Sequence, residues 1–112
     1  EHFAGAFPLW LAPEQVWIVP VSDKFVGYAI RVKEQLQSAI PSLRVIIRDE
    51  NETLGKKIRE GEKQKIPYLV VVGEKEKKQH TLSPRRRQKG DLGSMKIMVF
   101  TKLLEREIQK RN

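Results

Sequence analysis

Three short apolar runs rich in β-branched residues constrain the fold more than any other feature of this sequence. They are VWIVPV at residues 16–21, RVIIRD at residues 44–49 and YLVVV at residues 68–72. All three are expected strands: the first has the nearly continuous pattern of a strand covered on both faces, and the third is expected to be buried. Each is far shorter than the roughly 20 apolar residues that a membrane-spanning helix needs, so we expect no membrane span.

Helical patterns fill the two segments between these runs. After the first run, Ser22 is a candidate N-cap, and apolar residues then recur at spacings of four and three until Pro41: Phe25, Ala29, Val32, Leu36 and Ala39. After the second run we expect a helix over residues 53–65. Its inner face would carry Leu54, Ile58 and Gly61, and a solvated opposite face would carry Lys56, Arg59 and Lys63.

The rest of the chain predicts one more strand and one more helix. Residues 80–86 form the expected fourth strand, which Pro84 places at an edge of the sheet or interrupts. Ser94 is expected to cap a last helix over residues 95–110. Strand, helix, strand, helix, strand is the order of a parallel sheet covered on both sides. We therefore predict an α/β domain of three layers with a mixed, mostly parallel sheet.

Polar residues follow the second and third expected strands. Ligands of open α/β sheets bind beyond the carboxyl ends of the strands. We expect the turns at residues 49–52 and 73–76 to open on the same rim, joined there by the arginine triplet at residues 85–87. If the triplet alternates along a strand, Arg85 and Arg87 share one face and Arg86 lies on the other.

Charge is distributed unevenly along the chain. The net charge is +8, yet residues 1–43 hold three basic and four acidic residues, and residues 44–112 hold nineteen and ten. A basic excess confined to one part of a chain is typical of a surface that binds polyanions, although it also serves solubility. Zero cysteines exclude disulfides and thiolate metal sites and fit an intracellular protein.

The sequence offers little support for catalysis. His2 and His80 are the only histidines, and neither lies in a nucleophile or metal motif. The glycines match neither of the two common phosphate-loop spacings. Glu74 and Glu76 lie two residues apart in an expected extended turn, without an apolar pocket to shift a pKa, and a solvated turn is the simpler interpretation. We therefore assign no catalytic residue and no metal site.

RNA recognition fits the polar residues better. A carboxylate can accept two hydrogen bonds from guanine, so Glu76 is the candidate guanine reader. Asn51 carries a donor and an acceptor for a base edge, although a turn or cap role is equally open. Arginine donates to base carbonyls and to phosphate, although the triplet could also be solvated charge.

Several segments, in order along the whole chain, resemble the C-terminal anticodon-binding domain of threonyl-tRNA synthetases, which are class II aminoacyl-tRNA synthetases. They are AGAFPLWLAPEQV, IVPVSDK, RDENETLGKKIRE, KIPYLVVVGEKE and the RRR and GDLGSM group. The resemblance implies a five-stranded mixed sheet flanked by helices, which binds threonine tRNA and reads G and U at the second and third anticodon positions.

The resemblance also assigns roles to particular residues. The family's base-contacting asparagine, glutamate and arginine correspond to Asn51, Glu76 and Arg85. Contacts with the RNA backbone are expected from the remaining basic candidates: Lys57, Arg59, Arg86, Arg87 and Lys89.

Residues 14–112 are thus the expected anticodon-binding domain, and residues 1–13 a connector from an upstream catalytic domain. The resemblance implies that the parent is a cytoplasmic or organellar, homodimeric threonine-tRNA ligase. ATP, magnesium and zinc would belong to its catalytic domain, and no cofactor to this segment. The alternative is a protein-interaction module that kept the fold and lost base reading. It is suggested by Thr53 and Pro84, which depart from the family pattern, and by the doubly apolar last helix.

Overall fold

The structure is a computed structural model that describes residues 9, 12–49, 52–87 and 89–110 of the 112-residue chain. The described part contains eleven elements, in this order: β1 (Val16–Pro20), a 3-10 turn (Asp23–Phe25), α1 (Val26–Ala39), β2 (Val45–Ile47), α2 (Leu54–Lys63), β3 (Tyr68–Val72), α3 (Glu74–Gln79), β4 (Thr81–Arg86), β5 (Gly90–Asp91), β6 (Met95–Lys96) and α4 (Ile97–Lys110). None of the helices in the described ranges is long and apolar enough to cross a membrane.

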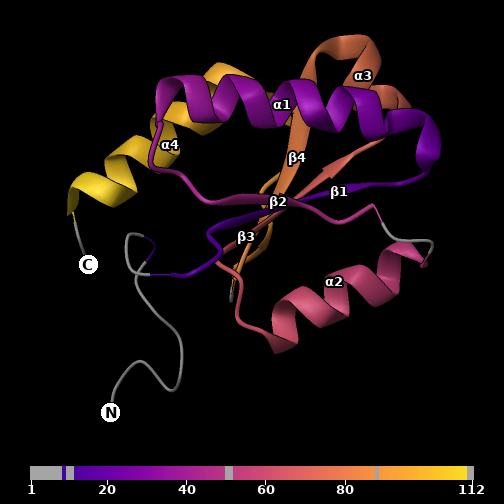
Figure 1. The fold of residues 1–112 in the computed structure, drawn as a ribbon, viewed down its shortest axis with the longest axis horizontal. Coiled ribbons are helices and arrows are strands. Elements are labelled where there is room, and N and C mark those ends of the chain that lie inside the picture. The colour runs from indigo at the N-terminus through magenta and orange to yellow at the C-terminus, as the bar shows by residue number, and fades with distance from the viewer. Residues whose placement is uncertain (1–8, 10–11, 50–51, 88, 111–112) are drawn as a thin grey trace.

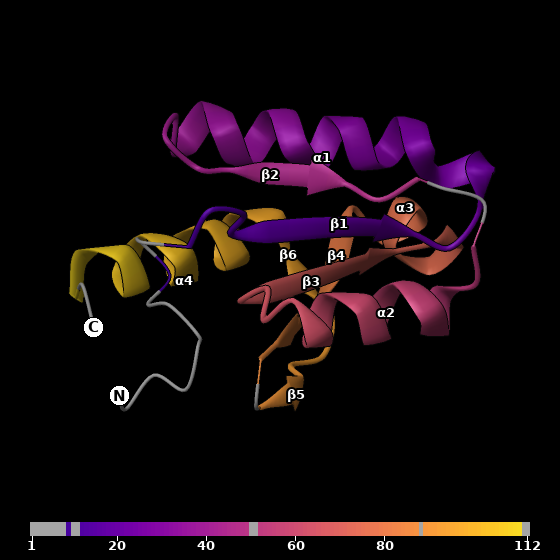
Figure 2. The ribbon, with the colours of Figure 1, turned by 60° about the horizontal axis from the view of Figure 1, so that its bottom comes forward.

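The strands form one mixed sheet in the order β2-β1-β3-β4-β5, and β6 pairs with β4 beside β5. Figure 1 shows β1 to β4 of this sheet, and Figure 2 also labels β5 and β6. β1 is parallel to both β2 and β3, whereas β4 is antiparallel to β3, β5 and β6. The predicted mixed α/β sheet is confirmed. It is less parallel than expected, because the chain returns through α3 along β4 in the opposite direction.

Helices cover both faces of this sheet, which gives the predicted three layers (Figure 2). α1 and α4 lie on one face, over a large buried cluster that includes Ile18, Val70, Leu36 and Phe100. α2 lies on the other face, over a smaller cluster built from Trp17, Val19, Ile66 and Leu69. β1 and β3 are therefore buried from two sides, which explains why they lack strict alternation, whereas Ile46 of the edge strand β2 is 38% exposed.

α2 packs closely on its face of the sheet. A Cβ at Gly61 would lie 2.5 Å from Cδ2 of Leu69, so any larger residue there would have to displace the buried Leu69 side chain. The Thr53 side chain accepts a hydrogen bond from the Lys56 backbone N–H at 3.2 Å and caps the helix. Thr53, a departure from the family pattern, thus has a structural role here.

The predictions for Pro84 are wrong in both forms, because β4 is continuous and has strands on both sides. Pro84 pairs with Val70 of β3, and its carbonyl accepts a hydrogen bond from the Leu92 N–H on the other side. On that other side β6 pairs with Thr81 and Leu82, and β5 with Arg85 and Arg86. Pro84 lies at the gap between these two short strands, where its missing N–H interrupts no ladder pair.

Two predicted helix starts are also corrected. The 3-10 turn precedes α1, which begins at Val26, and the Ser22 side chain makes no capping hydrogen bond. The last helix begins at Ile97 rather than at residue 95, because Met95 and Lys96 pair with β4 as β6. Before α1 the first residues of the helical pattern form a tight 3-10 turn. Before α4 they pair with β4, which is distant in sequence.

Candidate nucleic-acid interface

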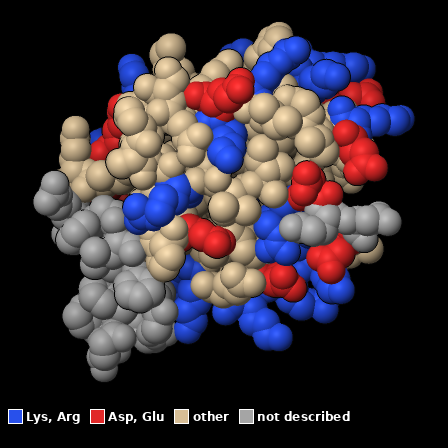
Figure 3. Space-filling view, in the orientation of Figure 1, with Lys and Arg blue, Asp and Glu red and all other residues tan. Residues whose placement is uncertain are grey.

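Basic side chains gather in two places on the face that Figure 3 shows, along its lower part and at its upper right over α3. Acidic side chains lie between them, so this face is not a single uniformly positive surface. The excess of positive charge is therefore compatible with RNA without pointing to one binding residue. Particular contacts have to identify the site.

Glu76 lies in the first turn of α3, where an extended turn was predicted. Its Oε1 atom accepts a hydrogen bond from the Gly73 backbone N–H at 2.8 Å, and its Oε2 atom accepts one from the Ser83 hydroxyl at 2.7 Å. The first of these closes a cap at the start of the helix. The predicted extended geometry of Glu74 and Glu76 is thus wrong, because this cap turns the segment into a helix.

Gly73 has to be small for this arrangement. A Cβ there would lie 3.0 Å from Cγ2 of Val21 and 3.3 Å from Oε1 of Glu76. Any side chain at Gly73 would therefore press on the carboxylate that the Gly73 N–H binds.

Arg85 lies on the same face of β4 as Ser83, since side chains two residues apart in a strand share a face. In register, Arg85 is opposite Leu69 and Ser83 is opposite Val71, so this row continues the face that α2 covers. Val71, Ser83 and Arg85 are only partly buried, which leaves the row half open beside α2. The two residues from Ser83 to Arg85 span roughly 7 Å along the strand.

The Arg85 guanidinium is only loosely engaged. Its Nη2 atom lies 3.8 Å from Oε2 of Glu62 on α2, and both side chains are partly exposed. Such a pair contributes little to stability and can be exchanged for a ligand at low cost. All three arginines of the triplet line a small cavity of about 130 Å³ together with Glu62 and Ile66.

The arginine triplet does not lie on the predicted rim. β4 is antiparallel to β3, so Arg85 and Arg86 pair with Leu69 and Tyr68 at the start of β3, whereas Gly73 follows its end. For the first part of the rim prediction, β2 and β3 are both parallel to β1, so their carboxyl ends lie at the same edge of the sheet, and residues 50 and 51 of the first turn lie outside the described residues. Glu76 and Arg85 are connected along the sheet face, through Ser83, and not along the rim.

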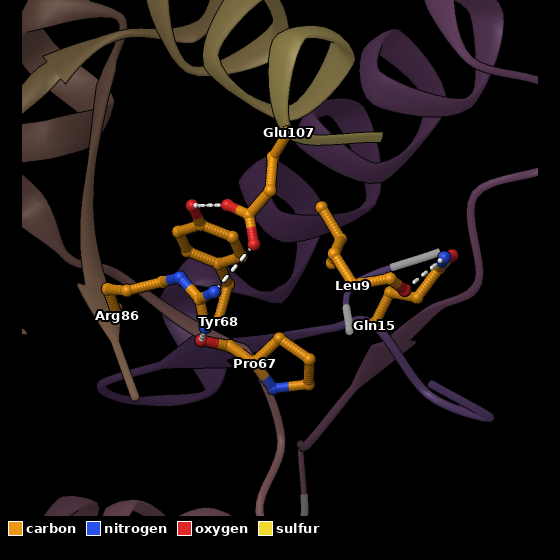
Figure 4. A network of polar contacts seen from close by, with 6 residues as sticks. All are labelled: Leu9, Gln15, Pro67, Tyr68, Arg86 and Glu107. Atoms are coloured by element: carbon orange, nitrogen blue, oxygen red, sulfur yellow. Dashed lines mark hydrogen bonds and ion pairs between the residues drawn. The ribbon is translucent and has the colours of Figure 1, made fainter. Parts of the chain in front are cut away.

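Arg86 points to the opposite face and is held there (Figure 4). Its guanidinium pairs with Glu107 of α4 and lies 5.0 Å from the centre of the Tyr68 ring. The Tyr68 hydroxyl donates to Glu107 at 2.6 Å. Burial, with the Glu107 contact as the next cause, raises the pKa of Tyr68 well above its usual value.

The remaining predicted residues are spread over both faces. Arg59 is exposed on α2, as expected. Lys57 is 4% exposed and lines a cavity of about 190 Å³ with Asp23, Asp49 and Glu52. Lys89 lines a cavity of about 400 Å³ on the α4 side, beside Arg86 and Arg106. Asn51 lies outside the described residues.

Sequence reasoning missed Ser83. Its position two residues before Arg85 on one strand was the available signal, but nothing local links it to Glu76.

His80 ends α3 in the left-handed conformation, with φ of 56°. Within the described ranges, no group of three or more histidine, cysteine, aspartate or glutamate side chains is arranged to hold a metal ion.

Comparison with known proteins identifies the family. The family model described as "Anticodon binding domain" matches residues 15–107. Threonine-tRNA ligase of Bacteroides fragilis is 49% identical over 109 residues, 97% of this chain, and that of Clostridioides difficile is 46% identical over 111 residues, 99% of this chain. The chain spans 17% of the length of each of these relatives. The chain therefore belongs to the anticodon-binding domain family.

A solved structure supports the same assignment. The RNA-binding domain of threonyl-tRNA synthetase from Cryptosporidium parvum has a TM-score of 0.85 to this chain at 26% identity, over 95% of this chain and 26% of the other. The resemblance to the anticodon-binding domain of threonyl-tRNA synthetases, drawn from sequence motifs, is confirmed by the family model, the relatives and this structure.

Proposed function

We propose that the chain binds threonine tRNA and reads G and U at the second and third anticodon positions. The observation that carries this proposal is the half-open row on β4, where the Glu76 carboxylate and the loosely paired Arg85 guanidinium flank Ser83. A carboxylate acceptor and a guanidinium donor at this spacing suit two successive bases of a single-stranded loop. Glu76 accepts from guanine, and Arg85 donates to a carbonyl of the neighbouring base.

The other candidates have unequal support. Arg59 and Arg87 lie on the α2 side and suit contacts with the RNA backbone. Arg86 is engaged with Glu107, and Lys57 is buried, so both have less support for such a role. Asn51 lies outside the described residues, and its contact with a base rests on the family resemblance alone.

The chain acts, in this proposal, as the recognition module of a longer ATP-dependent threonine-tRNA ligase. The relatives that it resembles carry that name, and it spans 17% of their length. ATP, magnesium and zinc would be bound by the catalytic part of such a ligase. Homodimer formation and a cytoplasmic location belong to the same proposal.

The direct test is titration of the chain with two RNA hairpins. One carries the threonine anticodon with GU at its last two positions, and the other has those two bases changed. We expect tighter binding of the first hairpin, and loss of that preference in Glu76→Ala. Equal affinity of the unaltered chain for both hairpins would refute base reading.

One observation favours a second function, docking of a protein partner. Met98 and Val99 on α4 are adjacent in sequence and are 69% and 52% exposed, so two large apolar side chains of this helix reach the surface. The other two reasons for this alternative are weaker now, because Thr53 caps α2 and Pro84 fits the gap beside β4. A chain that binds neither hairpin in a salt-dependent manner would favour this function.

A further inference from the structure

We propose that Ser83 is a positioning residue for base recognition, which acts by orienting the Glu76 carboxylate. This inference rests on the proposed function, because it explains how the guanine reader is held. The Ser83 hydroxyl donates to Oε2 of Glu76 at 2.7 Å, across seven residues of sequence. The contact is partly buried, so solvent competes with it less than at an open surface.

The carboxylate is held at both oxygens by two separate elements. The Gly73 N–H, at the end of β3, holds Oε1, and Ser83, within β4, holds Oε2. β3 and β4 pair through Val71 and Ser83, so the distance between the two donors is set by the sheet. Because both oxygens are already held in the folded chain, the Glu76 side chain loses its rotamer entropy during folding and not when a base binds.

The hydrogen bonds leave room for a ligand. An ionised carboxylate has about four acceptor sites, of which Gly73 and Ser83 use two. Each oxygen therefore keeps one further acceptor site. Two adjacent acceptors match the N1–H and exocyclic amine of guanine, whereas adenine has an acceptor at N1. Ser83 thus fixes the direction of these two sites.

Ser83 also sets the spacing between the two proposed base readers. It shares the face of β4 with Arg85, two residues further along the strand. By tying Glu76 of α3 to this row, it holds the carboxylate at a constant distance from the Arg85 backbone. Without the hydroxyl, Glu76 would keep its bond to Gly73 while the other oxygen is free to turn.

The test compares Ser83→Val with Ser83→Thr, two side chains of nearly the same shape that differ in the hydroxyl. Each is titrated with the hairpin carrying the middle anticodon guanine and with hairpins carrying adenine or inosine there. We expect Ser83→Val to lose about tenfold of the preference for guanine over adenine, and Ser83→Thr to retain it. Ser42→Ala, in an exposed turn, is the control for loss of a surface hydroxyl.

A double-mutant cycle separates positioning from a general effect on folding. If Ser83 acts through Glu76, Ser83→Val has no further effect on the guanine preference in the Glu76→Ala background. Urea denaturation of each variant checks that the chain is folded, and Ser83→Ala replaces Ser83→Val if valine prevents folding.

Three outcomes overturn the inference. The first is a guanine preference unchanged in both Ser83→Val and Ser83→Ala, while Glu76→Ala abolishes it; this leaves the proposed function intact. The second is an equal loss of affinity for all hairpins, which indicates a purely structural role. The third is no preference in the unaltered chain, which refutes the proposed function together with this inference.

Discussion

The two faces of β4 carry neighbouring arginines, Arg85 and Arg86, which make different contacts. Arg86 lies under α4, where Glu107 and the Tyr68 ring hold its guanidinium. Arg85 lies on the other face, beside α2, with one contact to Glu62 at 3.8 Å. The difference shows that a run of arginines is not a uniform basic patch. Strand alternation places one under α4 and leaves its neighbour available to a ligand.

The largest expected effect is on the face of β4 that α4 covers, the closed face. Glu107→Ala should lower the free energy of unfolding by about 2–3 kcal/mol, because the Tyr68 hydroxyl and the Arg86 guanidinium both lose a partly buried acceptor. Urea denaturation followed by circular dichroism measures it. Glu105→Ala, an exposed position on the same helix, should change stability by less than about 0.5 kcal/mol. Equal effects of the two variants would contradict a closed network.

The next prediction compares the two arginines directly. Arg85→Ala should lose about 1–3 kcal/mol of discrimination between the matched and changed hairpins, with stability little affected. Arg86→Ala should instead lower stability and retain the discrimination, because its guanidinium supports α4. Titration with the two hairpins gives the discrimination of each variant, and urea denaturation gives its stability. Loss of discrimination in Arg86→Ala alone would reverse the assignment of the two faces.

A smaller effect is expected from removing one hydroxyl on the closed face. Tyr68→Phe should cost about 1 kcal/mol near neutral pH, since one hydrogen bond to Glu107 is lost.

The same variant predicts a pH dependence. The pKa of Tyr68 is raised in the folded chain above its ordinary value of 10.0, so above that pH the folded state binds more protons than the unfolded state. Its contribution to stability is fully present below pH 10 and is lost as pH rises beyond it. Denaturation series above pH 10 should therefore show a steeper decline for the unaltered chain than for Tyr68→Phe. Parallel curves would mean that folding does not raise the pKa of the Tyr68 phenol.

The smallest effect is expected from an exposed charge on the open side. Arg59→Ala should weaken binding of both hairpins alike and lower the salt dependence of the affinity by about one unit, because a backbone contact carries no base information. Lys102→Ala, exposed on α4, should leave that dependence unchanged. The measurement is titration at several salt concentrations. The same change in both variants would remove the distinction between the faces.

Local sequence patterns were sufficient for much of the fold. The apolar runs predicted β1, β2 and β3, and the stripe from Phe25 to Leu36 is buried as expected, whereas Ala39 is exposed. β5, β6 and α3 were missed, because two-residue strands and a six-residue helix leave almost no periodic signal. α3 depends on Glu76 capping its first turn, and β6 depends on β4, which is distant in sequence.

The sequence alone was enough to predict the layered α/β class, the family and a set of candidate residues, because these follow from apolar periodicity and from motifs that are continuous in the chain. Strand alternation already predicted opposite faces for Arg85 and Arg86, and only the tertiary structure showed which face each one takes and connected Glu76 to Ser83. Both outcomes depend on the antiparallel return of β4, which pairs its end with the start of β3. The direction of a strand and the face that each side chain takes are set by contacts between distant residues, which local patterns do not record.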